Sequence, residues 1–250
     1  MERFNNWPKE AEIKVADVAV VILCGGFATR LGRRPKHLLE VDTNLLVLDL
    51  SLAPLLAQGA KKIIFATGAH HDETKAYAEK LRSFSGLHVE TLFSPPTGAL
   101  SAVVSVAQKV DLGCTFLLWN GDEIIPGIQL LDLYRYHLCF GKLITRVVCR
   151  KASVGTRKVA IKENWCVSFQ ETGDIFFATG AMVVNKEILD LAAKAVDSDS
   201  FWTSLLESEE VAGYVHNRSV NINSPDDLER VTRAYKLLKS QVQSCFVSGK

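Results

Sequence analysis

Two adjacent glycines and two cations that follow an apolar run are the residues whose types and spacing indicate chemistry. The apolar run before Cys24 breaks at Gly25 and Gly26, and Arg30 and Lys36 follow. Glycine permits unusual backbone dihedrals and a close approach of a ligand, and backbone N–H groups beyond it can hold anions. With both cations directed at the same anion, the pattern predicts a turn that binds a polyphosphate. Neither the dinucleotide-binding fingerprint nor the Walker-type phosphate loop can be read here.

A carboxylate stands where a second apolar run ends. Asp122 follows residues 116–121, at the carboxyl end of a predicted buried strand. Mg²⁺ prefers hard oxygen ligands and is often held by one or two carboxylates together with substrate phosphates. Taken alone, a strand-end aspartate is more typical of a turn or a helix cap. The glycine and cation pattern at the end of the first strand favours the metal instead.

Strand-like and helix-like runs alternate through the first part of the chain. The predicted strands are 17–23, 62–67, 88–93 and 115–119, and the predicted helices are 46–59, 72–84 and 98–110. Repeated strand–helix–strand units predict an α/β fold with a mainly parallel mixed sheet and helices on both faces. Gly25 and Asp122 then lie at the carboxyl ends of strands, where ligands collect in such sheets.

The pattern changes beyond residue 140. The predicted elements there are closely spaced strands at 142–150, 158–162 and 165–170, a strand at 180–184, and helices near 186–196 and 199–208. The closely spaced strands predict a small antiparallel section. Ser224 and Pro225 open a final helix, in which Asp226 and Asp227 are interpreted as first-turn acids favoured by the helix dipole. No repeat or linker is found, so we expect an N-terminal extension over 1–16 and a single domain over 17–243.

Composition limits the classes of partner. The chain has 250 residues, 48% of them hydrophobic, and a formal net charge of +1, which argues against nucleic acid and acidic membranes as partners. No run is long enough to cross a bilayer, and the first residues lack the apolar centre of a secretory signal. Six scattered cysteines without a C-x-x-C pair indicate reduced thiols in a cytoplasmic protein.

The first signature resembles that of the nucleotidyltransferases that make nucleotide sugars, usually written L-x-G-G-x-G-T-R-L…P-K-x-L-L-x-V. The matching residues are Leu23, Gly25, Gly26, Thr29, Arg30, Leu31, Pro35, Lys36, Leu38, Leu39 and Val41. Ala28 replaces the third glycine. The resemblance extends from about Val18 to Tyr235. It implies a Rossmann-like fold with a nucleotide-binding half over about 17–140 and an acceptor-binding half over about 141–243.

The resemblance also implies a Mg²⁺ site and a set of phosphate contacts. The Asn-Gly-Asp run ending at Asp122 resembles the element whose aspartate binds the catalytic metal. The family's second metal ligand lies just before the final helix, which leaves Asn221 and Asn223 as candidates, with Asn223 narrowly favoured. Arg30 is then assigned to the triphosphate and the leaving pyrophosphate, and Lys36 to the phosphates of donor and acceptor.

Further contacts follow from two weaker matches. The segment 94–100 resembles a G-T-x-G-A-L run that holds base and ribose, although a proline-bounded loop leading into a helix explains it equally well. The implied nucleotide contacts are Leu23, Gly25, Gly26, Thr29, Thr97 and Gly98, and the implied acceptor contacts are Glu171, Thr179 and Gly180. Thr172 stands where a phosphate-binding lysine is expected, and Lys158 and Lys162 are the candidates to compensate.

The implied activity is transfer of a nucleoside monophosphate from a nucleoside triphosphate to a sugar 1-phosphate, with release of pyrophosphate. The acceptor phosphate would attack the α-phosphorus in line, assisted by Mg²⁺. A homo-oligomer is compatible with this interpretation. Two alternatives stay open. The first is a non-sugar acceptor such as molybdopterin or a phosphorylated alcohol, which the two asparagines and the missing lysine favour. The second is a catalytically weak nucleotide-binding protein.

Overall fold

The computed structural model describes residues 14–26, 34–84, 86–94, 98–153, 156–162, 166–168, 174–195, 197–233 and 235. Four of the candidate site residues, Thr29, Arg30, Thr97 and Glu171, lie outside the described residues. No helix in these ranges combines the length and apolarity needed to cross a membrane.

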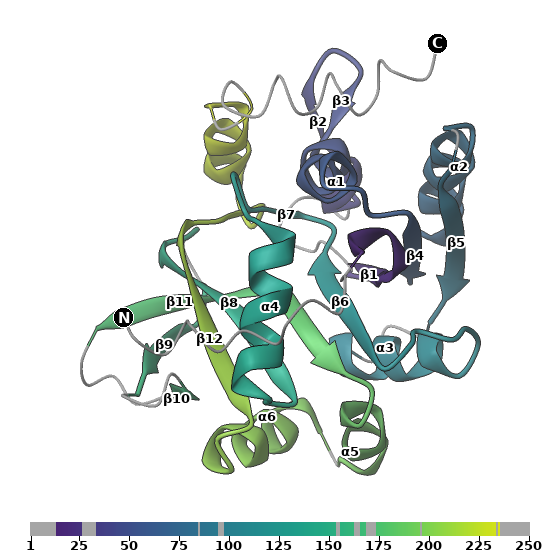
Figure 1. Ribbon diagram of the computed structural model, residues 1–250. Coiled ribbons are helices and arrows are strands. Elements are labelled where there is room, and N and C mark those ends of the chain that lie inside the picture. Colours follow the sequence, from purple (N-terminus) through teal and green to yellow (C-terminus); the bar gives the residue numbers. More distant parts are fainter. Residues whose placement is uncertain are drawn as a thin grey trace.

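A nine-stranded mixed sheet forms the centre of the described structure (Figure 1). Its strands are β1 (Ala19–Cys24), β4 (Lys62–Thr67), β5 (His88–Phe93), β6 (Thr115–Asn120), β8 (Ile144–Lys151), β9 (Lys158–Ile161), β10 (Val167–Ser168), β11 (Ile175–Asn185) and β12 (Val211–Arg218). The order is β10-β9-β11-β6-β1-β4-β5, and β8 lies between β11 and β12. The pairs β1–β4, β1–β6, β4–β5 and β8–β12 are parallel, whereas β11 is antiparallel to β6, β8 and β9. The predicted α/β class with a mainly parallel mixed sheet is confirmed.

Helices cover both faces of the sheet because its central strands are apolar on both sides. In β1, the side chain of Val21 packs with one buried cluster, while those of Val20 and Ile22 pack with another. Helices α3 (Ala99–Ala107), α5 (Ile188–Lys194) and α6 (Ser198–Glu207) contribute to the first cluster. Helices α1 (Val47–Ala57), α2 (His71–Arg82) and α4 (Leu130–Phe140) contribute to the second.

Short elements connect the rest of the described chain. They are the turns η2 (Val15–Asp17) and η4 (Lys36–Leu38), the hairpin β2 (Glu40–Asp42) and β3 (Leu45–Leu46), the pair β7 (Glu123–Ile124) and β13 (Val220–Asn221), and a final helix over residues 225–233. In the β7–β13 pair Asn221 lies opposite Glu123, and the Ile222 N–H donates to the Asp122 carbonyl at 3.2 Å. This pairing brings the segment before the final helix to the end of β6.

Two features of the second half differ from the prediction. The predicted strand 180–184 is only the end of β11, which begins at Ile175. No predicted strand corresponds to β12, which pairs in parallel with β8. The predicted antiparallel section is present, because β8 and β9 are both antiparallel to β11 and β10 is antiparallel to β9.

Candidate active site

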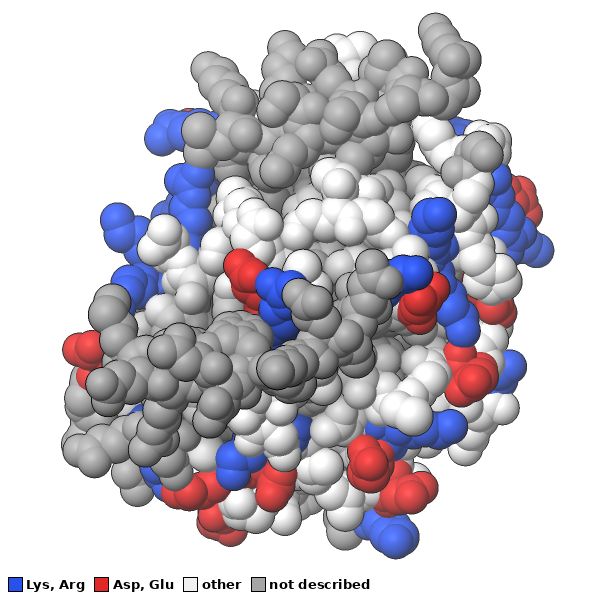
Figure 2. Space-filling model, viewed as in Figure 1, with Lys and Arg blue, Asp and Glu red and all other residues white. Residues whose placement is uncertain are grey.

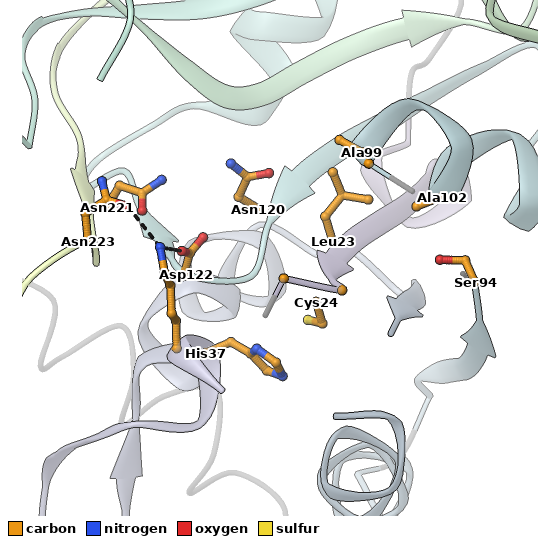
Figure 3. A pocket seen from close by; sticks show the side chains of 14 residues that line it. Leu23, Cys24, His37, Ser94, Ala99, Ala102, Asn120, Asp122, Asn221 and Asn223 are labelled. Carbon is orange, nitrogen blue, oxygen red and sulfur yellow. Dashed lines mark hydrogen bonds and ion pairs between the residues drawn. The ribbon is translucent and has the colours of Figure 1, made fainter. Parts of the chain in front are cut away.

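A cavity of about 470 Å³ opens at the carboxyl ends of β1 and β6 (Figure 3). The candidate residues that line it are Leu23, Gly25, Gly26, Lys36, Gly98, Asp122, Asn221 and Asn223. These residues come from separate parts of the sequence. The fold therefore brings the glycine turn, the lysine, the strand-end carboxylate and both asparagines to one place.

The Lys36 ammonium lies between a carboxylate and an amide. Lys36 Nζ donates to Asn223 Oδ1 at 2.9 Å and stands 3.4 Å from Asp122 Oδ2 (Figure 3). Lys36 begins the turn η4 directly after Pro35, whose fixed φ directs the chain into that turn. Asp122 and Asn223 lie 101 positions apart in the sequence. Their side-chain oxygens nevertheless converge on one cation, the Lys36 ammonium.

Burial and the nearby positive charge have opposite effects on the pKa of Asp122. Desolvation raises the pKa of its carboxyl, and the Lys36 ammonium lowers it. The Asp122 side chain keeps 19% of its surface exposed, so one side of it remains open to the cavity. A second cation brought near it would favour the ionised form further.

Asn221 presents an unpaired acceptor close to this pair. Its side-chain Oδ1 is buried and, in the part of the chain that the structure describes, has no hydrogen-bond partner. Its main chain is fixed by Ser153, whose Oγ accepts from the Asn221 N–H at 2.9 Å and donates to the Asn221 carbonyl at 2.7 Å. A buried acceptor without a donor is costly, and a bound cation would satisfy it.

These donors fit Mg²⁺. They are one carboxylate and two amide oxygens, all hard ligands, and an ion with this preference also keeps waters and binds substrate phosphates. No group of three or more His, Cys, Asp or Glu side chains suited to a metal occurs among the described residues. A Mg²⁺ ion held by one carboxylate and two amides would have coordination positions left for waters and phosphate oxygens.

Asp227 does more than occupy the first turn of the final helix. Its carboxylate Oδ2 accepts from the Asn223 N–H at 2.9 Å and from the Ser224 hydroxyl at 2.8 Å. The residue is 1% exposed. It therefore fixes the main chain of Asn223. The signal available in the sequence is its place three residues after the cap residue Ser224.

The glycine turn is supported by a glycine that the sequence pattern does not single out. A Cβ on Gly68 would lie 2.7 Å from the Gly25 carbonyl oxygen, so the end of β4 approaches the turn backbone to backbone. On the other side, the Gly121 N–H donates to the Leu23 carbonyl at 3.0 Å, and a Cβ on Gly121 would lie 2.7 Å from Cys24 Sγ. Small residues thus let three strand ends meet under the cavity.

Two candidate acceptor contacts lie behind the cavity wall rather than in it. A Cβ on Gly180 would overlap the side-chain amide of Asn120, so the glycine leaves room for Asn120, which lines the cavity. Thr179 is buried and its hydroxyl donates to the Val147 carbonyl at 2.7 Å. The pairing of β11 with β8 shifts register here, between Ala178 and Met182.

Glu123 is a buried acid that sequence reasoning missed. It is 1% exposed, and its Oε2 accepts from the Gly180 N–H at 2.5 Å. Burial raises the pKa of Glu123 to about 7, against the opposing effect of the Gly180 hydrogen bond. The neighbouring Arg146, whose Nε donates to the Thr179 carbonyl at 2.8 Å, also lowers that pKa. The acid sits beside Asp122 in sequence, and its partner Gly180 lies far along the chain.

His37 lines the cavity as a neutral side chain. Its Nε2 lies 2.8 Å from Thr74 Oγ1, and the Thr74 hydroxyl donates its hydrogen to the His70 carbonyl at 2.8 Å. His37 Nε2 must therefore carry the hydrogen in this contact. Burial lowers the pKa of His37 to about 4. The packing observed for His37 accounts for its place beside Lys36.

The sheet order and the position of the cavity are typical of an open α/β fold. In an open, mainly parallel sheet, ligands bind at the carboxyl ends of the strands. The inositol-1-phosphate CTP transferase from T. maritima has this fold, with a TM-score of 0.69, 16% identity, and coverage of 92% of this chain and 98% of that one. HddC from Yersinia pseudotuberculosis, complexed with GMP-PN, matches with a TM-score of 0.66, 16% identity, and coverage of 87% and 99%. The UTP-bound UGPase from Acinetobacter baumannii matches with a TM-score of 0.67, 14% identity, and coverage of 88% and 93%. The fold is that of the nucleotidyltransferases.

Residues 20–132 match the family model of the MobA-like NTP transferase domain. That stretch of the chain is similar to MobA-like NTP transferase domains, and the resemblance to nucleotidyltransferases is confirmed. It contains the glycine turn, Lys36 and Asp122, while Asn221 and Asn223 lie beyond it. No curated protein matches the chain.

Proposed function

We propose that this protein transfers a nucleoside monophosphate from a nucleoside triphosphate to a sugar 1-phosphate and releases pyrophosphate. One observation carries the proposal. The Lys36 ammonium, the Asp122 carboxylate and the Asn223 amide converge at a cavity that begins at the Gly25–Gly26 turn. Cationic and metal-binding groups beside an open glycine backbone suit a polyphosphate.

The nucleotide occupies the cavity in this proposal. Gly25 and Gly26 line it without side chains, so a triphosphate can lie against their backbone. Gly98 lines it where α3 begins. The Lys36 ammonium binds phosphate oxygens, and Arg30, from the same signature, is assigned to the triphosphate and the leaving pyrophosphate.

Three oxygen donors of this cavity are the proposed Mg²⁺ ligands. Asp122, with Asn223 and Asn221, would hold the ion, and all three residues line the cavity. A bound Mg²⁺ ion would neutralise negative charge on the phosphates of the donor nucleotide and of the acceptor. Asn221 joins the set because its buried Oδ1 has no hydrogen-bond partner within the described residues.

The chain's own residues align and neutralise the reactants instead of forming a covalent bond with them. Lys36 can contact phosphates while staying within reach of Asp122, and Asp227 keeps the Asn223 main chain in place. Burial raises the pKa of the Cys24 thiol well above its usual value, so this thiol stays protonated and is a poor nucleophile. In-line attack by an acceptor phosphate needs only alignment and charge stabilisation.

A sugar 1-phosphate is the proposed acceptor because one matched structure is described as a putative glucose-1-phosphate thymidylyltransferase from Bacillus anthracis. The proposal keeps a nucleotide-binding half over 17–140 and an acceptor-binding half over 141–243. A non-sugar acceptor is the second candidate. The MobA-like family model over residues 20–132 favours it, together with the two asparagines at the metal-binding positions.

The test is pyrophosphate release with Mg²⁺. Each of the four ribonucleoside triphosphates and dTTP is combined with a panel of sugar 1-phosphates, molybdopterin and phosphorylated alcohols. We expect release with one donor and one sugar 1-phosphate, and a loss of about 10²-fold or more in Asp122→Ala and Lys36→Ala. Asp226→Ala, an exposed acid in the same region, is the matched control and should keep full turnover. Release with a non-sugar acceptor alone would select the second candidate, and normal turnover in Asp122→Ala would refute the proposed mechanism.

A further inference from the structure

A second cavity, of about 280 Å³, is lined by cations and, within the described part of the chain, by no acid. Lys151 and Arg218, at the ends of β8 and β12, face it together with Arg230 and Arg233 of the final helix. Figure 2 shows Lys and Arg side chains gathered along the upper left edge of the molecule, where Figure 1 places this helix and the adjacent strand ends. Cations gathered in this way attract an anion from elsewhere.

The two strand-end cations are direct neighbours. Arg218 lies opposite Lys151 in the parallel pairing of β12 with β8. Like charges in opposite positions on paired strands are destabilising. No ion pair within the described residues involves either side chain, whereas Arg230 stands 3.7 Å from Asp227 and Arg233 pairs with Glu229.

The cavity also touches the segment that carries the proposed metal ligands. Ser153 lines it, and the Ser153 hydroxyl holds the Asn221 main chain through two hydrogen bonds. Arg230 lines it as well and pairs with Asp227, whose carboxylate accepts from the Asn223 N–H. An anion bound to these cations would therefore be linked to Asn221 through Ser153, and to Asn223 through Arg230 and Asp227.

We propose that this cavity is a second anion-binding site, which takes a small phosphorylated molecule. Arginine forks match phosphate oxygens in two-point geometry, and three of the four cations are arginines. The volume lies just below the usual range for ligand sites, so it suits a phosphate or diphosphate group rather than a whole dinucleotide. The formal net charge of +1 argues against a nucleic acid here.

The test is calorimetric titration of the full chain with inorganic pyrophosphate, in EDTA. The Lys36→Ala variant weakens binding at the active site, so that the second site can be observed. In that background we expect pyrophosphate binding to weaken about tenfold or more when Lys151→Ala and Arg218→Ala are added. Lys75→Ala with Lys80→Ala, two exposed lysines of α2, makes the same change in net charge and should leave binding unchanged.

Three results would overturn the proposal. The first is that no pyrophosphate binds in the Lys36→Ala background. The second is that binding survives the loss of Lys151 and Arg218, or falls equally in the α2 control. The third is binding of a single-stranded oligonucleotide at these cations without binding of pyrophosphate, which would favour nucleic acid. Circular dichroism of each variant checks that the substitutions leave the fold intact.

Discussion

Glu123 gives the stability of this protein a pH dependence that can be calculated from its burial. Burial raises the pKa of Glu123 from an ordinary 4.5 to about 7. Between these two pH values the unfolded chain has lost the proton and the folded chain keeps it. The free energy of unfolding therefore falls as pH rises through this window. At 1.36 kcal/mol per unit, the loss is about 3 kcal/mol.

The ionisation of His37 changes the free energy of unfolding in the opposite direction over much of the same pH range. Burial lowers the pKa of His37 from 6.5 to about 4. Between these values the unfolded chain binds the extra proton, so stability rises with pH. The contributions of Glu123 and His37 nearly cancel between about pH 4.5 and pH 6.5. The wild-type protein alone would thus hide both effects.

The substitution Glu123→Gln separates them. Glutamine keeps an oxygen that can accept from the Gly180 N–H, but it does not ionise. We expect the difference in unfolding free energy between Glu123→Gln and wild type to change by about 1.4 kcal/mol per pH unit from pH 4.5 to pH 7. Urea unfolding in EDTA at half-unit pH steps measures it.

The test depends on how the difference in unfolding free energy between Glu123→Gln and wild type changes with pH. The added amide hydrogens of glutamine can destabilise the fold by an amount that does not depend on pH, and such a constant amount leaves the slope unchanged. The exposed Glu79→Gln in α2 is the matched control and should give a difference that is flat with pH. A flat difference for Glu123→Gln as well would show that Glu123 is ionised in the folded protein, and would refute the reasoning.

Three other outcomes are expected. Gly180→Ala, whose methyl would overlap the Asn120 side chain, should lower the free energy of unfolding by about 1–3 kcal/mol and weaken nucleotide binding. Gly26→Ala, whose Cβ would meet no atom of the described residues within 4 Å, should leave stability unchanged in the same urea titrations. Asp227→Ala should cost about 1–2 kcal/mol through the lost contacts to Asn223 and Ser224, measured by thermal unfolding. Removal of divalent metal with EDTA should abolish pyrophosphate release, and added Mg²⁺ should restore it; release that persists in EDTA would contradict the metal assignment.

Local sequence patterns are sufficient to predict much of the fold. The predicted strands 62–67 and 88–93 coincide with β4 and β5, because β4 is a short apolar run and β5 contains the strand-forming residues Val89, Thr91 and Phe93. Strand β12 escapes prediction because Gly213 and the polar residues 216–218 interrupt its apolar pattern. Its pairing with β8, far away in the sequence, compensates for them.

Local motifs likewise predict some residues of the candidate site and miss others. Motifs within one segment are enough to place Gly25, Lys36 and Asp122 at the cavity. Gly68 and Glu123 cannot be found in this way, because each matters through a partner on another strand: Gly68 through Gly25, and Glu123 through Gly180. No local signal distinguishes a glycine that packs against a backbone from one that only ends a strand.

Strand β11 has a consequence for how this molecule can close around its substrates. It pairs with β6 on one side, with β8 on the other, and with β9 near its beginning. One continuous strand thus belongs to both the proposed nucleotide-binding and acceptor-binding parts of the sheet. A hinge between these parts would have to break the hydrogen bonds of β11, so we expect the two parts of the sheet to move as one body and not as two lobes that swing together.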